Sequence, residues 1–221
     1  MNQSEVWNER DRSLKYWDEF HTGYERREIV TDGWLDRWES YIKACGGPVL
    51  DLGCGSGNDT LYFIEQGKKV VACDQSPNAI ASVKRNFPEV YEARCLNFLD
   101  GFDWETESFE IICADLCLHY FSQQDTREIL RELHRILTPE GYLFVRVNSV
   151  KDVLHGAGEG EEVEKHLYRT NRGTLKRFFD REDIEEFFSE FEILFCEEED
   201  MNRYSKAKVV YTLCLKKAGK Q

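Results

Sequence analysis

The chain has 221 residues, of which 41% are hydrophobic and 32% charged, and its formal net charge at pH 7 is −13. This length suits one domain with a substantial core, and this composition excludes a disordered chain. No run approaches the ~20 apolar residues of a membrane-spanning helix. The acidic balance disfavours nucleic acid and the polar N-terminus shows no secretion signal, so we expect a cytoplasmic protein without membrane or nucleic-acid partners.

Eight cysteines occur without any Cys-x-x-Cys pair, and four of them fall in or beside predicted strands. Small buried thiols are common in the cores of proteins from reducing compartments. We therefore expect reduced core cysteines, with no disulfide framework and no metal site.

The first 45 residues are rich in aromatic side chains. They hold four of the five tryptophans, namely Trp7, Trp17, Trp34 and Trp38. Apolar residues from Trp34 to Ile42 recur with helical spacing, which predicts a helix that packs on a sheet. We expect residues 1–45 to form a helical segment that serves as an N-terminal lid.

Strand and helix patterns alternate through residues 46–148, the predicted core. The predicted strands are residues 49–52, 69–74, 90–96, 108–115 and 142–148. Helices are expected between them, with Ser76 and Ser122 as N-caps and Gly67 as a C-terminal glycine. Such alternation predicts right-handed βαβ units, and therefore a Rossmann-like α/β fold with a mostly parallel sheet and helices on both faces.

The remainder of the chain has a different character. Residues 150–173 are glycine-rich, charged and weakly periodic, which predicts a long loop or lid inserted after the core. Residues 174–221 follow with a predicted helix near 181–189 and a pair of strands near 191–197 and 207–215. No internal repeat and no linker divide the chain, so we expect a single domain over 1–221.

The stretch DLGCGSGND follows the first predicted strand and places three glycines between two aspartates. A glycine turn between a strand and a helix places a ligand beside free N–H groups at the carboxyl edge of a sheet. A dinucleotide fingerprint fails here, because Asn58 or Thr60 stands where a third small residue is required. The pattern that does fit is acidic-x-Gly-x-Gly-x-Gly, formed by Asp51, Gly53, Gly55 and Gly57. A loop of this pattern would hold the amino and carboxyl groups of a methionine-like ligand. Its aspartate would contact the ligand's ammonium group through a water molecule.

Polar residues follow the next three predicted strands. Asp74 ends the second strand, where a carboxylate can accept hydrogen bonds from both hydroxyls of a ribose, and Gln75 would lie against the sugar or adenine. After the third strand, the Asn97 amide and the backbone at Phe98 are placed to bond an adenine ring. Asp115 ends the fourth strand, beside the expected place of a sulfonium.

Together these residues resemble the small class I S-adenosylmethionine-dependent methyltransferases, especially the bacterial methyltransferase-domain type. The likeness covers residues 48–148 through VLDLGCGSG, VVACD, SFEIICADLCLHYF and LRELHRILTPEGYLFVRVNS, and extends more loosely to RFFDREDIEEFF and MNRYSKAK. It implies a seven-stranded sheet whose last strand is antiparallel, with S-adenosyl-L-methionine over its carboxyl edge. The family usually carries Asp where Asn97 stands, and we expect binding to survive because an amide oxygen also accepts from adenine.

The resemblance implies methyl transfer by in-line displacement, to an acceptor that we expect to be a small molecule. Such an enzyme mainly positions a nucleophile about 3 Å from the methyl group and excludes water, so we name no catalytic residue. Residues expected near the acceptor are His119, Tyr120, Arg146 and His155. Tyr16 or Trp17 would stabilise the sulfonium through a cation–π contact.

Two other functions remain open from the sequence. One is a non-catalytic module that keeps S-adenosylmethionine as a regulatory or structural ligand. The other is a nicotinamide-dependent oxidoreductase, which the failed dinucleotide fingerprint disfavours. For a methyltransferase, we expect residues 7–24 and 150–173 to become ordered on cofactor binding, with the glycines at 156, 158 and 160 allowing the movement.

Overall fold

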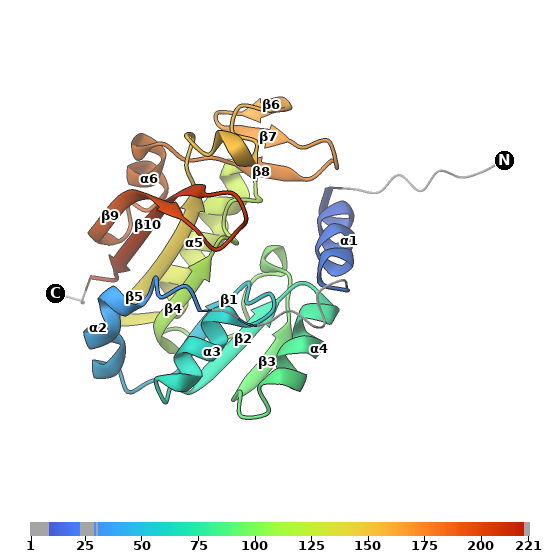
Figure 1. The fold of residues 1–221 in the computed structure, drawn as a ribbon. Coiled ribbons are helices and arrows are strands. Elements are labelled where there is room, and N and C mark those ends of the chain that lie inside the picture. The colour runs from blue at the N-terminus through green and yellow to red at the C-terminus, as the bar shows by residue number, and fades with distance from the viewer. Residues whose placement is uncertain (1–8, 23–28, 30, 219–221) are drawn as a thin grey trace.

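The computed structural model describes residues 9–22, 29 and 31–218 of the chain (Figure 1). Trp7 and both ends of the expected 7–24 segment lie outside the described residues. The described part is built around a large sheet, with helices on its two faces and a small second sheet beside it.

The large sheet has seven strands in the order β3-β2-β1-β4-β5-β10-β9. Strands β1 to β5 run parallel, and β10 is antiparallel to both of its neighbours, so the seven-stranded prediction with an antiparallel last strand is confirmed. The strand order reverses between β1 and β4, which opens a crevice at the carboxyl ends of these strands. The strands are β1 Val49–Leu52, β2 Val70–Asp74, β3 Glu92–Cys95, β4 Phe109–Asp115, β5 Leu137–Asn148, β9 Glu192–Met201 and β10 Lys208–Lys216.

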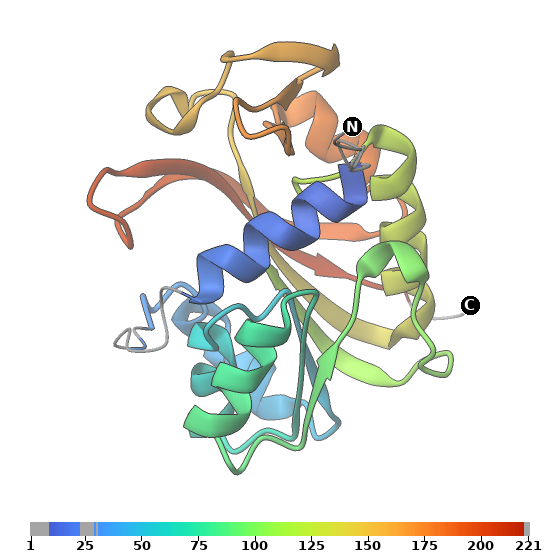
Figure 2. The same cartoon turned by 90° about the vertical axis from the view of Figure 1, so that its right-hand side faces the viewer.

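Alternate residues of the strands face two separate cores, because successive side chains of a strand point to opposite faces. Leu50 of β1 packs in the core beneath α5 Gln123–Ile136 and α6 Arg181–Phe187. Val49 packs on the other face with Trp38, which belongs to η1 Asp36–Trp38. That face also carries α2 Glu39–Ala44, α3 Asn58–Glu65 and α4 Pro77–Asn86 (Figures 1 and 2).

The predicted helix ends in the core are confirmed by their hydrogen bonds. The Ser76 hydroxyl accepts from the Ala79 N–H at 3.1 Å, and Ser122 accepts from the Asp125 N–H at 3.1 Å. Gly67, just beyond the C-cap of α3, has the left-handed φ of +71° that favours glycine. Strand β5 begins at Leu137, directly after α5, and so starts earlier than the predicted strand over 142–148.

The segment after the core is more regular than expected. It contains η3 Val153–His155 and two strands of a three-stranded antiparallel sheet, β6 Glu161–Glu164 and β7 Leu167–Arg169; the third is β8 Leu175–Arg177. The prediction of a long loop over 150–173 was therefore wrong, and its role as a lid stays a prediction. Strand β6 is largely exposed and acidic, so it forms by backbone pairing with β7 and shows no apolar alternation in sequence.

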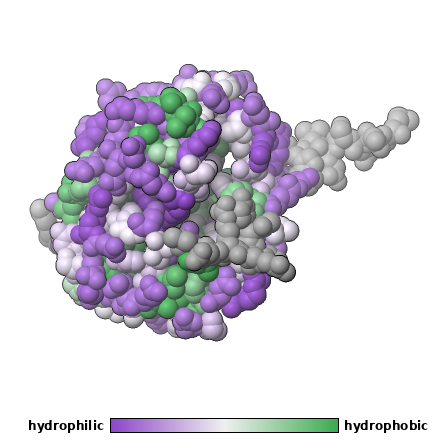
Figure 3. All heavy atoms as spheres, viewed as in Figure 1, coloured by the Kyte–Doolittle hydropathy of each residue, from purple (hydrophilic) through white to green (hydrophobic). Residues whose placement is uncertain are grey.

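Helix α1, Glu9–Thr22, crosses the carboxyl ends of the large sheet (Figure 2). Asp18 attaches it to the start of α4, since its Oδ1 accepts from the Ser76 hydroxyl at 2.9 Å and from the Asn78 N–H at 3.2 Å. Hydrophilic side chains predominate on the face shown in Figure 3. Among the described residues, no helix has the length and apolar character needed to cross a membrane.

Candidate functional site

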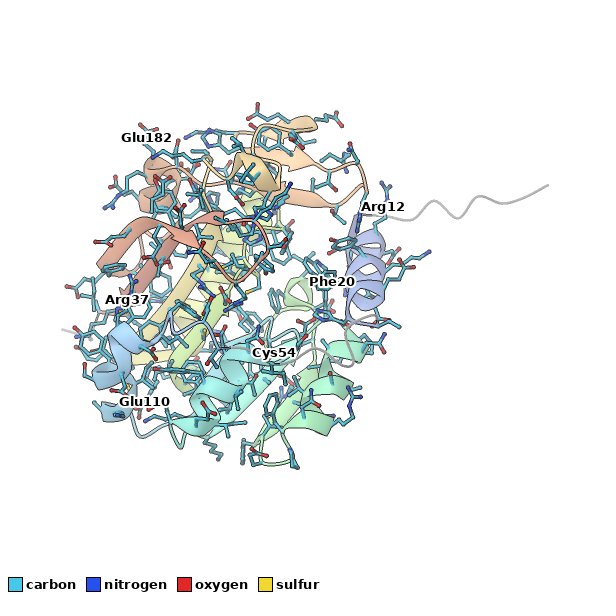
Figure 4. The ribbon with its side chains drawn as sticks, in the orientation of Figure 1. Arg12, Phe20, Arg37, Cys54, Glu110 and Glu182 are labelled. Atoms are coloured by element: carbon cyan, nitrogen blue, oxygen red, sulfur yellow. The ribbon has the colours of Figure 1, made fainter. Side chains whose placement is uncertain are left out.

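A cavity of about 490 Å³ lies at the carboxyl ends of the central strands, within the usual size of small-ligand sites. Its wall combines α1, the glycine loop after β1 and the ends of β2, β3 and β4, with single residues from later segments. Figure 4 labels two lining residues, Phe20 on α1 and Cys54 on the glycine loop. The fold thus brings the N-terminal helix over the edge where the sequence predicted a ligand.

The three glycines of the loop all have left-handed φ angles, +69° at Gly53, +50° at Gly55 and +93° at Gly57. A Cβ at Gly53 would lie 2.4 Å from the Cys117 Cβ, and one at Gly57 would lie 2.5 Å from the Phe87 ring. Gly53 and Gly55 line the cavity, whereas Gly57 packs behind it. The predicted cofactor contact of Gly57 stays a prediction.

The aspartate at the start of the loop lies behind the cavity wall. Asp51 is buried, and its Oδ2 accepts a hydrogen bond from the Thr60 hydroxyl at 2.5 Å. Burial raises the pKa of Asp51 to about 7. The carboxylate that does line the cavity here is Asp59, whose Oδ1 accepts from the Trp34 indole N–H at 2.9 Å. The contact of Asp51 with an ammonium through a water stays a prediction.

Asp74 and Gln75, at the end of β2, both line the cavity. The Asp74 carboxylate accepts from the Gly55 N–H at 3.0 Å and from the Ser76 N–H at 2.9 Å, so it also holds the glycine loop. Burial raises the pKa of Asp74 above its ordinary value. Gln75 Nε2 lies 3.3 Å from the Ser13 hydroxyl of α1 and ties the helix to the sheet edge.

Asn97 and Phe98 also reach the cavity, at the start of η2 Phe98–Asp100. The Asn97 amide oxygen accepts from the Leu99 N–H at 3.0 Å, so it caps this turn as well as facing the ligand space. Its Nδ2 donates to Gln75 Oε1 at 3.4 Å. The adenine contacts expected of this pair stay predictions.

Asp115 lines the cavity within a buried ion-pair network. Arg146 donates to both of its carboxylate oxygens, at 2.7 and 2.8 Å, and Arg203 donates at 2.7 Å. Asp32 accepts from both arginines. Burial alone would raise the pKa of Asp115, but the two guanidinium groups hold it below its ordinary value.

Arg146 was expected beside the acceptor, which stays a prediction, but the structure places its side chain outside the cavity wall. Its side chain is 3% exposed and is absent from the cavity wall, because Asp115 and Asp32 hold it on both sides. The arginine that lines the cavity is Arg203, from the loop between β9 and β10. A buried arginine in an apolar strand needs carboxylate partners, and two of them satisfy Arg146 here.

His119, Tyr120 and His155 lie together in the wall, as do Tyr16 and Trp17. The Trp17 and Tyr120 rings meet edge to face at 4.9 Å. Burial lowers the pKa of His119 well below its ordinary value, with further lowering by Lys208 and Lys176, so its imidazole is neutral near pH 7. Its Nδ1 has no hydrogen-bond partner among the described residues.

The sequence patterns did not predict several of the residues that line the cavity. They are Phe20, His21, Asn58, Asp59, Lys176, Arg203, Tyr204 and Lys208. Asp59 stands in the quoted glycine stretch, and Arg203 to Lys208 fall in the stretch MNRYSKAK, which carried part of the resemblance. A cluster of basic and aromatic residues in a turn between two strands was the available signal. No sequence signal pointed to Lys176, because it lies in a short strand of an irregular region.

Comparison with known proteins agrees with this geometry. Residues 49–141 match a family model described as a methyltransferase domain. An uncharacterized methyltransferase of Synechocystis is 31% identical over 96 residues, 43% of this chain and 44% of that protein. The tRNA N(3)-methylcytidine methyltransferase trm141 of Schizosaccharomyces pombe is 26% identical over 207 residues, 83% of this chain and 82% of that protein.

The chain spans about half the length of the first curated relatives it matches, 52% and 44%. Solved structures show the same fold. The 1,6-didemethyltoxoflavin-N1-methyltransferase of Burkholderia thailandensis, solved with 1,6-didemethyltoxoflavin and S-adenosylhomocysteine, has a TM-score of 0.68 and 22% identity. That alignment covers 98% of this chain and 93% of the Burkholderia chain.

Proposed function

The chain carries the fold and the cofactor-binding core of a class I S-adenosylmethionine-dependent methyltransferase, and from this premise we propose that it methylates a small molecule. The main support for the proposal is the hydrogen bond that links the glycine loop to Asp74. Asp74 Oδ2 accepts from the Gly55 N–H at 3.0 Å, and both residues line one cavity. A carboxylate that can bind the ribose hydroxyls and a loop that can hold the amino-acid end of the cofactor therefore lie side by side.

The residues of the wall fit S-adenosylmethionine better than a dinucleotide. Asn58 stands in the wall at a position where a dinucleotide loop needs a glycine or alanine. We assign the ribose to Asp74 and the adenine to Asn97 and Phe98. The ammonium of the methionine end would lie near the carboxylate of Asp59, in addition to the indirect contact expected of Asp51.

The bound cofactor supplies a methyl group activated by positively charged sulfur. The protein's own residues orient the acceptor and keep water out. Trp17 and Phe20 of α1 and Tyr120 after β4 present apolar rings to the cavity, and such rings favour a desolvated cation. His119 receives no proton-transfer role, because its lowered pKa makes it a weak base near pH 7.

A transfer RNA is the second candidate acceptor. The observation that favours it is the similarity to the trm141 enzyme, which extends over 83% of this chain. Against it, the net charge of −13 repels a phosphate backbone, and α1 covers the sheet edge where the cofactor would lie. We therefore favour a small molecule that enters the cavity beside α1.

Calorimetry with S-adenosylmethionine, S-adenosylhomocysteine and NAD tests the cofactor assignment. Binding of S-adenosylmethionine and S-adenosylhomocysteine in the micromolar range is expected, about −8 kcal/mol. Tight NAD binding without response to either compound would overturn it. Transfer of tritium from labelled S-adenosylmethionine to small molecules or to transfer RNA then identifies the acceptor class, and binding without any product would favour the non-catalytic module.

A further inference from the structure

A second hollow of about 390 Å³ adjoins the cofactor cavity, between α1 and residues 154–178. The two hollows share part of their walls, namely Tyr16, Trp17, Tyr120, His155 and Lys176. Asp74 and Asn97, which we assign to the adenosine, line the first hollow and not the second. The second hollow is therefore positioned to hold a molecule that meets the cofactor from the opposite side.

The walls of the second hollow combine several aromatic rings with polar side chains, among them the exposed Arg172. Trp17 and Tyr120 meet edge to face at 4.9 Å, and Tyr16 meets Trp17 at 5.0 Å. Tyr168 and Phe178 of the small-sheet region line the same space, with ring centres 6.0 Å apart. Rings arranged in this way favour a flat apolar body by offset and edge-to-face contacts.

Lys176 lies at the junction of the two hollows and is half-buried. Its Nζ donates to the His155 carbonyl oxygen at 2.7 Å and lies 5.1 Å from the Phe178 ring centre. In the described part of the chain, no salt bridge within 4.0 Å pairs it with a carboxylate. The neighbouring cation, Lys208, already has Asp152 as its partner at 3.0 Å.

The electrostatics of this junction favour an anion. Burial, together with repulsion from Lys208, lowers the pKa of Lys176 to about 8. Asp152 attracts Lys176 and offsets part of this lowering, but its carboxylate pairs directly with Lys208. A half-buried ammonium with no carboxylate of its own within salt-bridge distance is unfavourable, and a ligand anion would supply that direct partner. Of the residues that line the second hollow, Glu159 alone is acidic, and it is exposed.

We propose that the methyl acceptor is a small aromatic acid whose ring lies in the second hollow and whose anionic group binds Lys176. The proposal rests on the proposed methyltransferase function and names the substrate class of that same site. Lys176 is thus a specificity residue: it recognises the acceptor's charge and orients the molecule toward the cofactor.

Calorimetry on the full chain saturated with S-adenosylhomocysteine tests the proposal without requiring turnover. The probes are benzoate, salicylate, 2-naphthoate and indole-3-acetate, each compared with its uncharged carboxamide. At least one carboxylate is expected to bind at least tenfold more tightly than its amide. Lys176→Met should abolish that preference, and Lys176→Arg should retain most of it because the positive charge remains.

Arg169→Met is the matched control, since Arg169 lies on the neighbouring strand β7 and outside both hollows. It removes one positive charge from the same small sheet and should leave the carboxylate preference intact. Titration with S-adenosylhomocysteine checks that each variant keeps a folded cofactor cavity.

Each other outcome overturns the inference. A wild-type protein that binds S-adenosylhomocysteine but prefers no carboxylate contradicts the acceptor class, while the proposed function stands. Equal losses in Lys176→Met and Arg169→Met would show a general charge effect. Transfer RNA binding that Lys176→Met weakens would assign the lysine to a phosphate. Failure of the wild-type protein to bind S-adenosylhomocysteine would instead overturn the proposed function.

Discussion

Arg146 holds Asp115 through a two-point ion pair, with Nε 2.7 Å from Oδ1 and Nη2 2.8 Å from Oδ2. The two residues are register partners on the neighbouring strands β4 and β5, so the sheet itself aligns them. Arg203 adds a third contact to Asp115 from the loop between β9 and β10. This pair therefore connects the central sheet to the far end of the chain at the cavity wall.

Replacing Arg146 by Met should destabilise the protein by about 3–5 kcal/mol, because the buried Asp115 charge loses its main partner. Urea unfolding at pH 7 measures the change. Arg181→Met is the control: Arg181 is exposed and pairs with Glu185 at 2.8 Å, so its loss should cost at most about 1 kcal/mol. Similar losses in both variants would contradict the structural importance of the buried pair.

The raised pKa of Asp51 makes the free energy of unfolding depend on pH. Its pKa is about 7 in the folded protein and ~3.9 in an unfolded chain, so the folded state binds more protons between these values. Stability from this group is therefore lost as the pH rises from ~4 to ~7. Asp51→Asn should flatten the dependence and keep an oxygen that accepts from Thr60. Urea unfolding between pH 5 and 8 compares the two proteins, and parallel curves would refute the assignment.

Alanine substitutions at Gly53 and Gly67 distinguish the cost of a steric clash from the cost of backbone strain. Their φ angles are nearly equal, +69° and +71°, but a Cβ at Gly53 would lie 2.4 Å from the Cys117 Cβ whereas nothing lies within 4 Å at Gly67. Gly67→Ala should cost about 1–2 kcal/mol, and Gly53→Ala should cost a further ~1–3 kcal/mol and weaken cofactor binding. Thermal unfolding and calorimetry measure both effects. Equal stability of the two variants would mean that the Cys117 side chain can move aside without loss of stability.

Asp74→Ala should reduce affinity for S-adenosylhomocysteine by about 2–4 kcal/mol, since each hydrogen bond to a charged group is worth ~1.5–3 kcal/mol. The Gly55 and Ser76 N–H groups also lose their acceptor, so a modest loss of stability should accompany the change. Calorimetry with Asp103→Ala, an exposed aspartate outside the cavity, provides the control. An unchanged dissociation constant in a folded Asp74→Ala protein would show that the ribose is held elsewhere.

Cofactor binding should slow hydrogen exchange in α1 and in residues 150–173. Tyr16, Trp17 and Phe20 bring α1 to the cavity wall, and His155 does so for the later segment. Exchange with and without S-adenosylhomocysteine measures this directly. Protection confined to residues 51–116 would mean that both segments are static packing and take no part in closure.

Local sequence patterns were sufficient to predict the core of the fold. Periodicity identified β1, β2 and α5, and Ser76 and Gly67 marked helix ends, because caps and amphipathic faces depend on residues a few positions apart. The position of Asp74 at the end of a strand likewise followed from local pattern. These features, with the glycine loop, were enough to indicate the cofactor class.

Which polar side chains face the cavity depends on how the elements pack together. Asp51 and Arg146 turned out to lie behind the wall, and Arg203 and Lys176 came to it from segments distant in sequence. Such placements depend on the order of strands in the sheet and on how burial, repulsion and ion pairing balance among groups that meet only after folding. No local pattern encodes that balance, because each partner lies on a different element.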